Sequence, residues 1–131
     1  MPWVELFAAL VVSHLAGDFL VQTEWQAMHK RGGLGRDPVA RRALLAHVST
    51  YTLTFVPVLI WVGAELGAIS AVGTAALIAF PHLVQDDGRL LIAYARRVKR
   101  TDADLATPLM VAVDQSFHLA TLFLIALLVG T

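Results

Sequence analysis

The stretch Ser13-His14-Leu15-Ala16-Gly17-Asp18-Phe19-Leu20-Val21-Gln22 lies at the end of an apolar run that begins at Trp3. A four-residue step turns an α-helix by about 40°, so His14 and Asp18 share one face and Gln22 lies close to the same line. Ionisable groups are costly inside a membrane helix. We therefore expect this face to look at protein, water or a metal ion rather than at lipid.

The composition is that of a membrane protein. Of the 131 residues, 57% are hydrophobic and 15% are charged, and the mean hydropathy is +0.68, which is more apolar than a soluble domain of this size requires. Cysteine is absent, so a bound metal would need nitrogen and oxygen ligands. The N-terminus lacks the basic region of a secretory signal peptide, so the first apolar run is expected to stay attached as a span.

Four apolar stretches each have roughly the 20 residues that cross a bilayer. They are residues 3–21, 43–62, 68–84 and 109–129. The sequence thus predicts an all-α, polytopic membrane protein, a four-transmembrane-helix bundle that forms a single domain over residues 1–131. Asp37-Pro38 and Thr107-Pro108 are typical of an N-cap followed by a first-turn proline. Pro57 predicts a kink in the second span. For the third span, a functional kink at Pro81 and a helix that simply ends at the interface are both open.

All Lys and Arg residues lie in two segments, 30–42 and 89–100. The positive-inside rule places both segments in the cytoplasm and both termini outside, in the cell inner (cytoplasmic) membrane. Segment 89–100 combines an apolar face with a basic one, which predicts a short interfacial amphipathic helix on an anionic leaflet. The expected partners are the lipid bilayer and its anionic headgroups, with no nucleic acid; the sequence leaves the oligomeric state open.

The His and Asp residues, which are energetically costly inside a membrane, recur at nearly constant spacing. His14-Leu-Ala-Gly-Asp18 resembles His82-Leu-Val-Gln-Asp86 at an offset of 68, and His47-Val-Ser-Thr-Tyr51 aligns with Asp114-Gln-Ser-Phe-His118 at an offset of 67. Two helical hairpins of one topology, about residues 3–62 and 68–129, are therefore predicted to pack about an axis along the membrane normal. Their polar groups would then meet in one layer near the cytoplasmic face.

Neutral imidazole and carboxylate groups suit zinc, iron or manganese, and helical bundles build metal sites from inward-facing ligands on adjacent helices. The candidate ligands are His14, Asp18, His47, His82, Asp86, Asp114 and His118. This set exceeds what one tetrahedral zinc requires, so a two-metal centre and one metal with supporting carboxylates are both open. Zinc is the expected ion, with iron or manganese as alternatives.

The same residues can instead form a buried hydrogen-bond and ion-pair network that fixes the bundle without metal. His29 lies beside Lys30 in the loop and is expected to be solvated. Tyr51 and Gln22 are candidate supporting donors, with packing or interface roles as the alternative. Gln115 is given no catalytic role.

These motifs together resemble a known family. His14-xxx-Asp18-Phe19-xx-Gln22, His47, His82-xxx-Asp86 and Asp114-Gln115-xx-His118 are similar to the bacterial membrane proteins catalogued as domain of unknown function 3307, over nearly the whole chain. The resemblance implies the membrane fold and the positions of the site residues. A looser similarity is to small membrane proteins described as metal-dependent hydrolases.

Three classes of function are consistent with the sequence. A membrane hydrolase would use a metal-bound water whose proton passes to Asp86 or Asp114, with an anionic substrate, such as a lipid phosphate, entering from the cytoplasm. A metal or proton-coupled transporter is the second class, although the outer halves of the spans offer little beyond Ser70 and Thr74 to carry an ion. The third class is a non-enzymatic role as a metal sensor, an assembly factor, or a small pore-forming or scaffold protein whose polar layer only specifies packing.

Overall fold

The computed structural model describes residues 1–102 and 104–131, and over these ranges the chain forms helices joined by short turns and loops, without a strand. The elements are α1 (Trp3–Leu15), η1 (Ala16–Val21), α2 (Glu24–His29), α3 (Pro38–Leu53), α4 (Val56–Leu66), α5 (Ala68–Asp86), α6 (Arg89–Tyr94), η2 (Ala95–Lys99) and α7 (Pro108–Gly130). The π-helical turns η1 and η2 directly continue α1 and α6. The predicted all-α class is confirmed.

Three helical segments are long and apolar enough to cross a membrane: Trp3–Val21, Ala68–Asp86 and Pro108–Gly130. A fourth span results if α3 and α4 count together, because the pair passes the same test although it bends by 54°. The described chain therefore has the three to four apolar helices of a membrane protein.

The helix boundaries follow from local sequence. Asp37 caps α3 by accepting hydrogen bonds from the backbone N–H groups of Val39 and Ala40, and Pro38 occupies the first turn, which confirms the predicted start. Pro57 lies in the first turn of α4, directly after the bend. Helix α5, in contrast, continues through Pro81 to its end at Asp86.

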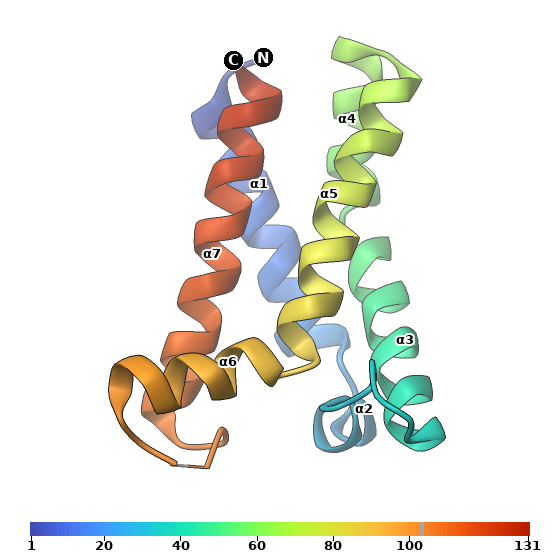
Figure 1. Cartoon of the computed structure of the whole chain (residues 1–131). Helices are drawn as coiled ribbons and strands as arrows, with labels where there is room; N and C mark the ends of the chain where they lie inside the picture. The colour runs from blue at the N-terminus through green and yellow to red at the C-terminus, as the bar shows by residue number, and fades with distance from the viewer. Residues whose placement is uncertain (103) are drawn as a thin grey trace.

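The long helices stand side by side, and α6 lies across one end of them (Figure 1). Contacts join α1 to α7, α7 to α5, and α5 to both α3 and α4. The two termini meet at the end opposite α6, where a Cβ on Gly130 would approach the Cα of Trp3 to 2.6 Å. The two termini thus lie at the same end of the bundle, and the expectation that this end is outside stays a prediction.

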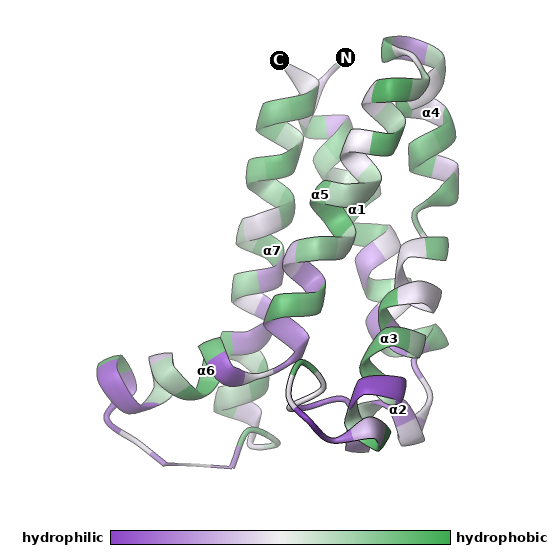
Figure 2. Ribbon diagram, turned by 45° about the vertical axis from the view of Figure 1, so that its right-hand side comes forward, coloured by the Kyte–Doolittle hydropathy of each residue, from purple (hydrophilic) through white to green (hydrophobic). Residues whose placement is uncertain are grey.

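The bundle has two halves of different chemistry. The terminal half, next to the chain ends, has an apolar core made of Leu6, Leu10, Tyr51, Phe55, Val58, Val62, Ile78, Leu122, Ile125 and Ala126. The polar half, toward α2 and α6, contains the buried histidines and aspartates (Figure 2). Apolar side chains also cover much of the outside, as at Ile69, which is 90% exposed. An apolar exterior around a polar interior is typical of a helix bundle in lipid.

Candidate metal centre

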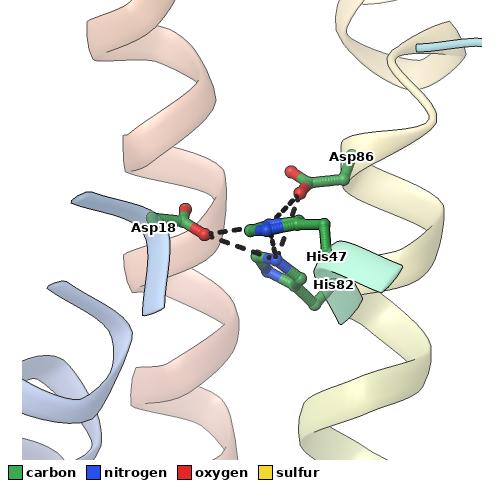
Figure 3. Close-up of side chains that lie close together, drawn as sticks. All are labelled: Asp18, His47, His82 and Asp86. Atoms are coloured by element: carbon green, nitrogen blue, oxygen red, sulfur yellow. Dashed lines mark hydrogen bonds and ion pairs between the residues drawn. The ribbon is translucent and has the colours of Figure 1, made fainter. Parts of the chain in front are cut away.

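Four side chains from three segments of the bundle point toward one another (Figure 3). Asp18 comes from η1, His47 from α3, and His82 and Asp86 lie one turn apart on α5. Each of the four is at most 7% exposed. We call this group the four-residue site.

The ligand-type atoms of the four-residue site lie unusually close together. The Nε2 atoms of His47 and His82 are 3.0 Å apart, and they lie 2.8 and 3.1 Å from Asp86 Oδ2. The same two nitrogens lie 3.3 and 3.4 Å from Asp18 Oδ1. Zinc bonds to nitrogen and oxygen of about 2.0 Å would place tetrahedral ligand atoms about 3.3 Å apart. The five distances are close to this spacing, so the four residues could hold a metal ion.

A second group shares Asp86 and adds Asp114 and His118 from α7. The Nδ1–H of His118 donates to the backbone carbonyl of Asp114 at 2.8 Å, which fixes the tautomer of a neutral ring. Its Nε2 then presents a lone pair to Asp86 Oδ1 at 3.2 Å. Two acceptors that face one another need a proton or a metal cation between them.

Within the described chain, four buried atoms lack a hydrogen-bond partner: Asp18 Oδ1, His47 Nδ1, His82 Nδ1 and His118 Nε2. Buried polar atoms without partners are costly and rare. Asp18 Oδ1 and His118 Nε2 both point into the cluster, toward other potential ligands. A cation bound there would satisfy these two atoms.

His14 is placed differently from the other candidate ligands, because both of its ring nitrogens have partners. Gln115 donates from Nε2 to Asp18 Oδ2 at 3.3 Å, so its Oε1 accepts from His14 Nε2–H at 2.8 Å. His14 Nδ1 then accepts from the Tyr51 hydroxyl at 3.0 Å. His14 and Gln115 thus form a relay that orients Asp18, and the supporting role of Gln115 was not anticipated from sequence.

Tyr51 also holds His82 in place. The two rings stack with centroids 3.4 Å apart and planes 4° apart. This packing requires a glycine on the neighbouring segment, because a Cβ on Gly17 would lie 2.5 Å from Tyr51 Cδ2. The supporting role expected for Tyr51 is therefore visible as both a hydrogen bond and a ring contact.

Lys30 was not among the site residues predicted from the sequence, but its side chain reaches into the cluster. Its Nζ donates to Asp86 Oδ2 and to Gln22 Oε1, both at 2.6 Å, and the residue is buried. Nothing in a basic loop segment distinguishes a lysine that reaches inward from its solvated neighbours. His29 is exposed, as expected.

The loop that follows Lys30 is fastened to the end of α5. The backbone N–H groups of Gly32 and Leu34 donate to the carbonyl and the carboxylate of Asp87, both at 2.8 Å. Arg89 Nε pairs with the same carboxylate at 3.2 Å. These contacts fix the base from which Lys30 reaches into the cluster.

The charges of the cluster are unbalanced when its imidazoles are neutral. Over the described residues, Asp18, Asp86 and Asp114 contribute three carboxylates, and Lys30 contributes one ammonium group. The remaining two negative charges equal the charge of one divalent cation. Uncompensated charge is costly in a buried site, so either a divalent ion or added protons on the imidazoles must balance it.

A cavity of about 260 Å³ adjoins the second group between α5, α6 and α7. Its lining consists of Gln85, Leu90, Leu91, Tyr94, Asp114 and Phe117. Asp114 therefore borders both the cavity and the histidine–aspartate cluster. The remaining lining is largely apolar and suits a hydrocarbon group.

A family model described as "Protein of unknown function (DUF3307)" matches residues 6–131. No curated protein and no solved structure matches the chain. The functional interpretation therefore depends on the geometry of the site.

Proposed function

The chain belongs to the DUF3307 family of proteins of unknown function, and from its geometry we propose that it is an integral membrane metalloprotein that hydrolyses an anionic or lipid-linked substrate. Zinc is the proposed ion, with iron or manganese as alternatives. The observation that carries the proposal is the convergence of two imidazole nitrogens and two carboxylate oxygens at 2.8 to 3.4 Å in a buried site.

The charge of the cluster supports a divalent ion. One such ion neutralises the excess of carboxylates over Lys30 without requiring protonated imidazoles. It also gives Asp18 Oδ1 the partner it lacks among the described residues. Both effects are large because the site is buried, where an unpaired charge is poorly solvated.

Hydrolysis would use Asp86 or Asp114 as the proton acceptor. A metal held by the histidines and aspartates of the cluster would supply Lewis-acid activation of a water, and the carboxylate of Asp86 or Asp114 would accept the proton of that water. The water oxygen would bond to the electrophilic phosphorus or carbonyl carbon of the substrate, the bond to the leaving oxygen would break, and the carboxylate would pass the proton to that oxygen, so that one water is consumed in each turnover. Asp114 is suited to this role because it also borders the cavity.

The proposed substrate class follows from the surroundings of the site. Under the positive-inside rule the basic segments 30–42 and 89–100 lie at the cytoplasmic face of the inner membrane, with both termini outside. These segments would attract anionic groups, and α6 with η2 would lie along anionic lipid headgroups. The largely apolar cavity between α5, α6 and α7 would take a lipid tail.

The apolar core of the terminal half favours hydrolysis over transport. The core of the terminal half consists of apolar side chains such as Leu10, Phe55 and Ile78. A charged ion that left the cluster toward the termini would have to cross this core, which is costly. A substrate that arrives and leaves at the polar end meets no such barrier.

The alternative is a metal-free scaffold whose polar layer only specifies packing, and Lys30 favours it. Its ammonium group lies 2.6 Å from Asp86 Oδ2 and compensates that carboxylate without a metal. Protonated imidazoles would supply the rest of the positive charge. The two proposals differ in metal content and in the response to chelators.

Elemental analysis of detergent-purified protein tests the proposal. We expect about one or more divalent ions per wild-type chain, and loss of the ion bound at the four-residue site from His47→Ala and Asp18→Asn. His29→Ala is the matched control, because this histidine is exposed and outside the cluster; it should retain the wild-type content. A wild type that binds no metal, with a melting temperature indifferent to chelator, would establish the scaffold instead.

Turnover is tested separately on phosphatidic acid in mixed micelles, with release of phosphate as the readout. We expect activity that chelator abolishes, that the matching metal restores, and that Asp114→Asn reduces at least 100-fold. The control Glu65→Gln removes an exposed carboxylate far from the cluster and should retain activity. If the metal-loaded protein hydrolysed neither phosphate esters nor carboxylic esters, the function would be limited to metal binding.

A further inference from the structure

We propose that Asp86, Asp114 and His118 hold a second divalent ion, and that this three-ligand position is where a phosphate monoester group of the substrate binds. The inference rests on the proposed function and assigns the reacting position within it. The four-residue site then holds a fully ligated supporting ion. The shared ligand is Asp86.

The first observation is the orientation of His118. The residue is 2% exposed, and its Nδ1–H is held by the backbone carbonyl of Asp114. Its Nε2 has no hydrogen-bond partner among the described residues, although it faces Asp86 Oδ1 at 3.2 Å. An imidazole with one nitrogen anchored to a carbonyl and the other free is oriented as a metal ligand.

The second observation is how Asp86 divides its two oxygens. Oδ2 faces the Nε2 atoms of His47 and His82, whereas Oδ1 faces His118. A carboxylate shared in this way can bridge two cations. Two-metal hydrolytic sites hold their ions about 3.5–4 Å apart, a separation that the two oxygens of one carboxylate can span.

The numbers of ligands distinguish the two positions. The four-residue site offers four ligand groups, whereas the second position offers three. Structural zinc sites are closed by four protein ligands, and catalytic sites keep three with one position open for water or substrate. The open coordination position therefore belongs to the second ion.

The exposure of the ligands to the cavity agrees with this assignment. The Asp114 side chain is 17% exposed and lines the cavity of about 260 Å³, whereas Asp18 and Asp86 are almost completely buried. A group that enters from the cavity reaches the second position first. The apolar lining of this cavity suits a hydrocarbon chain that is attached to the reacting group.

Charge balance indicates the substrate class. Two divalent ions together with Lys30 exceed the three carboxylates by two positive charges. A phosphate monoester dianion would neutralise this excess, and one of its oxygens would take the open position at the second ion. A neutral ester or an amide would leave the excess uncompensated in a buried site.

Metal titration of the full-length, chelator-treated protein with cobalt(II) tests the inference. We expect two cobalt ions per wild-type chain and one in Asp114→Asn and in His118→Gln, with the ion at the four-residue site retained. Inorganic phosphate should perturb the cobalt spectrum of the wild type and leave that of both variants unchanged. His29→Gln and Glu65→Gln should bind two ions, as controls outside the cluster.

The possible results separate the two proposals. A wild type that binds one ion, unchanged by Asp114→Asn and lost in His47→Ala, overturns the second position and leaves the proposed metal centre standing. A wild type that binds none overturns both. Because His118→Gln alters the buried interior, Asp114→Asn and the melting temperature of each variant show whether a lost ion reflects the ligand or the fold.

A further arm identifies the source of the phosphate group. Phosphatidic acid and glycerol phosphate are compared as competitors of inorganic phosphate in the cobalt assay. If phosphatidic acid binds at least tenfold more tightly than glycerol phosphate, the cavity is assigned to a lipid tail. If the two bind equally, the position is assigned to a soluble phosphate monoester. Binding of neither, with inorganic phosphate also without effect, contradicts the phosphate assignment.

Discussion

The terminal half and the polar half of this bundle are built from the same helices but stabilised by different interactions. The terminal half packs apolar side chains such as Leu10 and Phe55 against one another. The polar half brings carboxylates, imidazoles and one lysine within ion-pair distance. In lipid, apolar packing can be repeated by many sequences, whereas a buried charge requires a specific partner. The polar half therefore specifies the arrangement of the helices and contains the candidate metal centre.

The largest expected effect comes from Asp86→Ala in the polar half. Asp86 is the residue on which Lys30, three imidazoles and both proposed ions depend, so its removal leaves a buried ammonium group without its carboxylate. We expect a loss of about 3–5 kcal/mol in the free energy of unfolding, together with loss of bound metal. Denaturation in detergent and elemental analysis measure the two effects.

An exposed ion pair of similar length is the control for this prediction. Arg96 Nε and Asp102 Oδ1 lie 2.8 Å apart, but both side chains are mostly exposed. Asp102→Ala should cost less than about 1 kcal/mol and should not change metal content. Equal destabilisation by Asp86→Ala and Asp102→Ala would contradict the prediction that the buried charges of the polar half stabilise the fold more than an exposed ion pair does.

The terminal half should show the opposite combination. Leu10 is fully buried in the apolar core, and Leu10→Ala should cost about 3 kcal/mol through the cavity it leaves, with the wild-type metal content retained. Leu20→Ala is the matched control, since this leucine is 83% exposed. If Leu10→Ala also released the metal, the two halves would form one cooperative unit rather than two.

The junction of the two halves can be tested at Gly17. A Cβ there would lie 2.5 Å from the Tyr51 ring, which cannot retreat because it stacks on His82. Gly17→Ala should therefore cost about 2 kcal/mol and weaken metal binding through the adjacent Asp18. Gly73→Ala is the matched control, because a Cβ at that helical position meets nothing within 4 Å.

Gly73→Ala should even add a few tenths to about 1 kcal/mol of stability, since alanine favours the helix. Both variants are followed by thermal unfolding in detergent and by metal titration. A harmless Gly17→Ala would mean that η1 and α3 can separate at this point without disturbing the site.

Much of the fold was predictable because its signals are local. Apolar runs of sufficient length predicted the long apolar helices, and Asp37-Pro38 predicted the start of α3. The bend between α3 and α4 follows from Pro57, but the π-helical turn η1, which carries Asp18, has no comparable local signal. The internal repeat, the orientation in the membrane and the chemistry of the site stay predictions.

The site was predictable to the extent that its residues are costly in lipid. Buried imidazoles and carboxylates had to face one another, and the structure brings six of the seven candidates into two groups that share Asp86. The roles of His14 and Lys30 depend on partners 101 and 56 residues away. Such pairings are set by tertiary packing, so neither spacing nor composition could reveal that His14 orients Asp18 through Gln115.

The smallest expected effect tests this relay. Tyr51→Phe keeps the ring that stacks on His82 but removes the hydroxyl that donates to His14 Nδ1. We expect a cost of about 1 kcal/mol and roughly tenfold weaker metal binding, because supporting partners of ligands typically contribute at least that much. Tyr94→Phe, which keeps its edge contact with Phe117, should change neither quantity. A Tyr51→Phe variant with wild-type metal affinity would show that the Tyr51 hydroxyl is not needed to orient Asp18, because Gln115 still donates to that carboxylate.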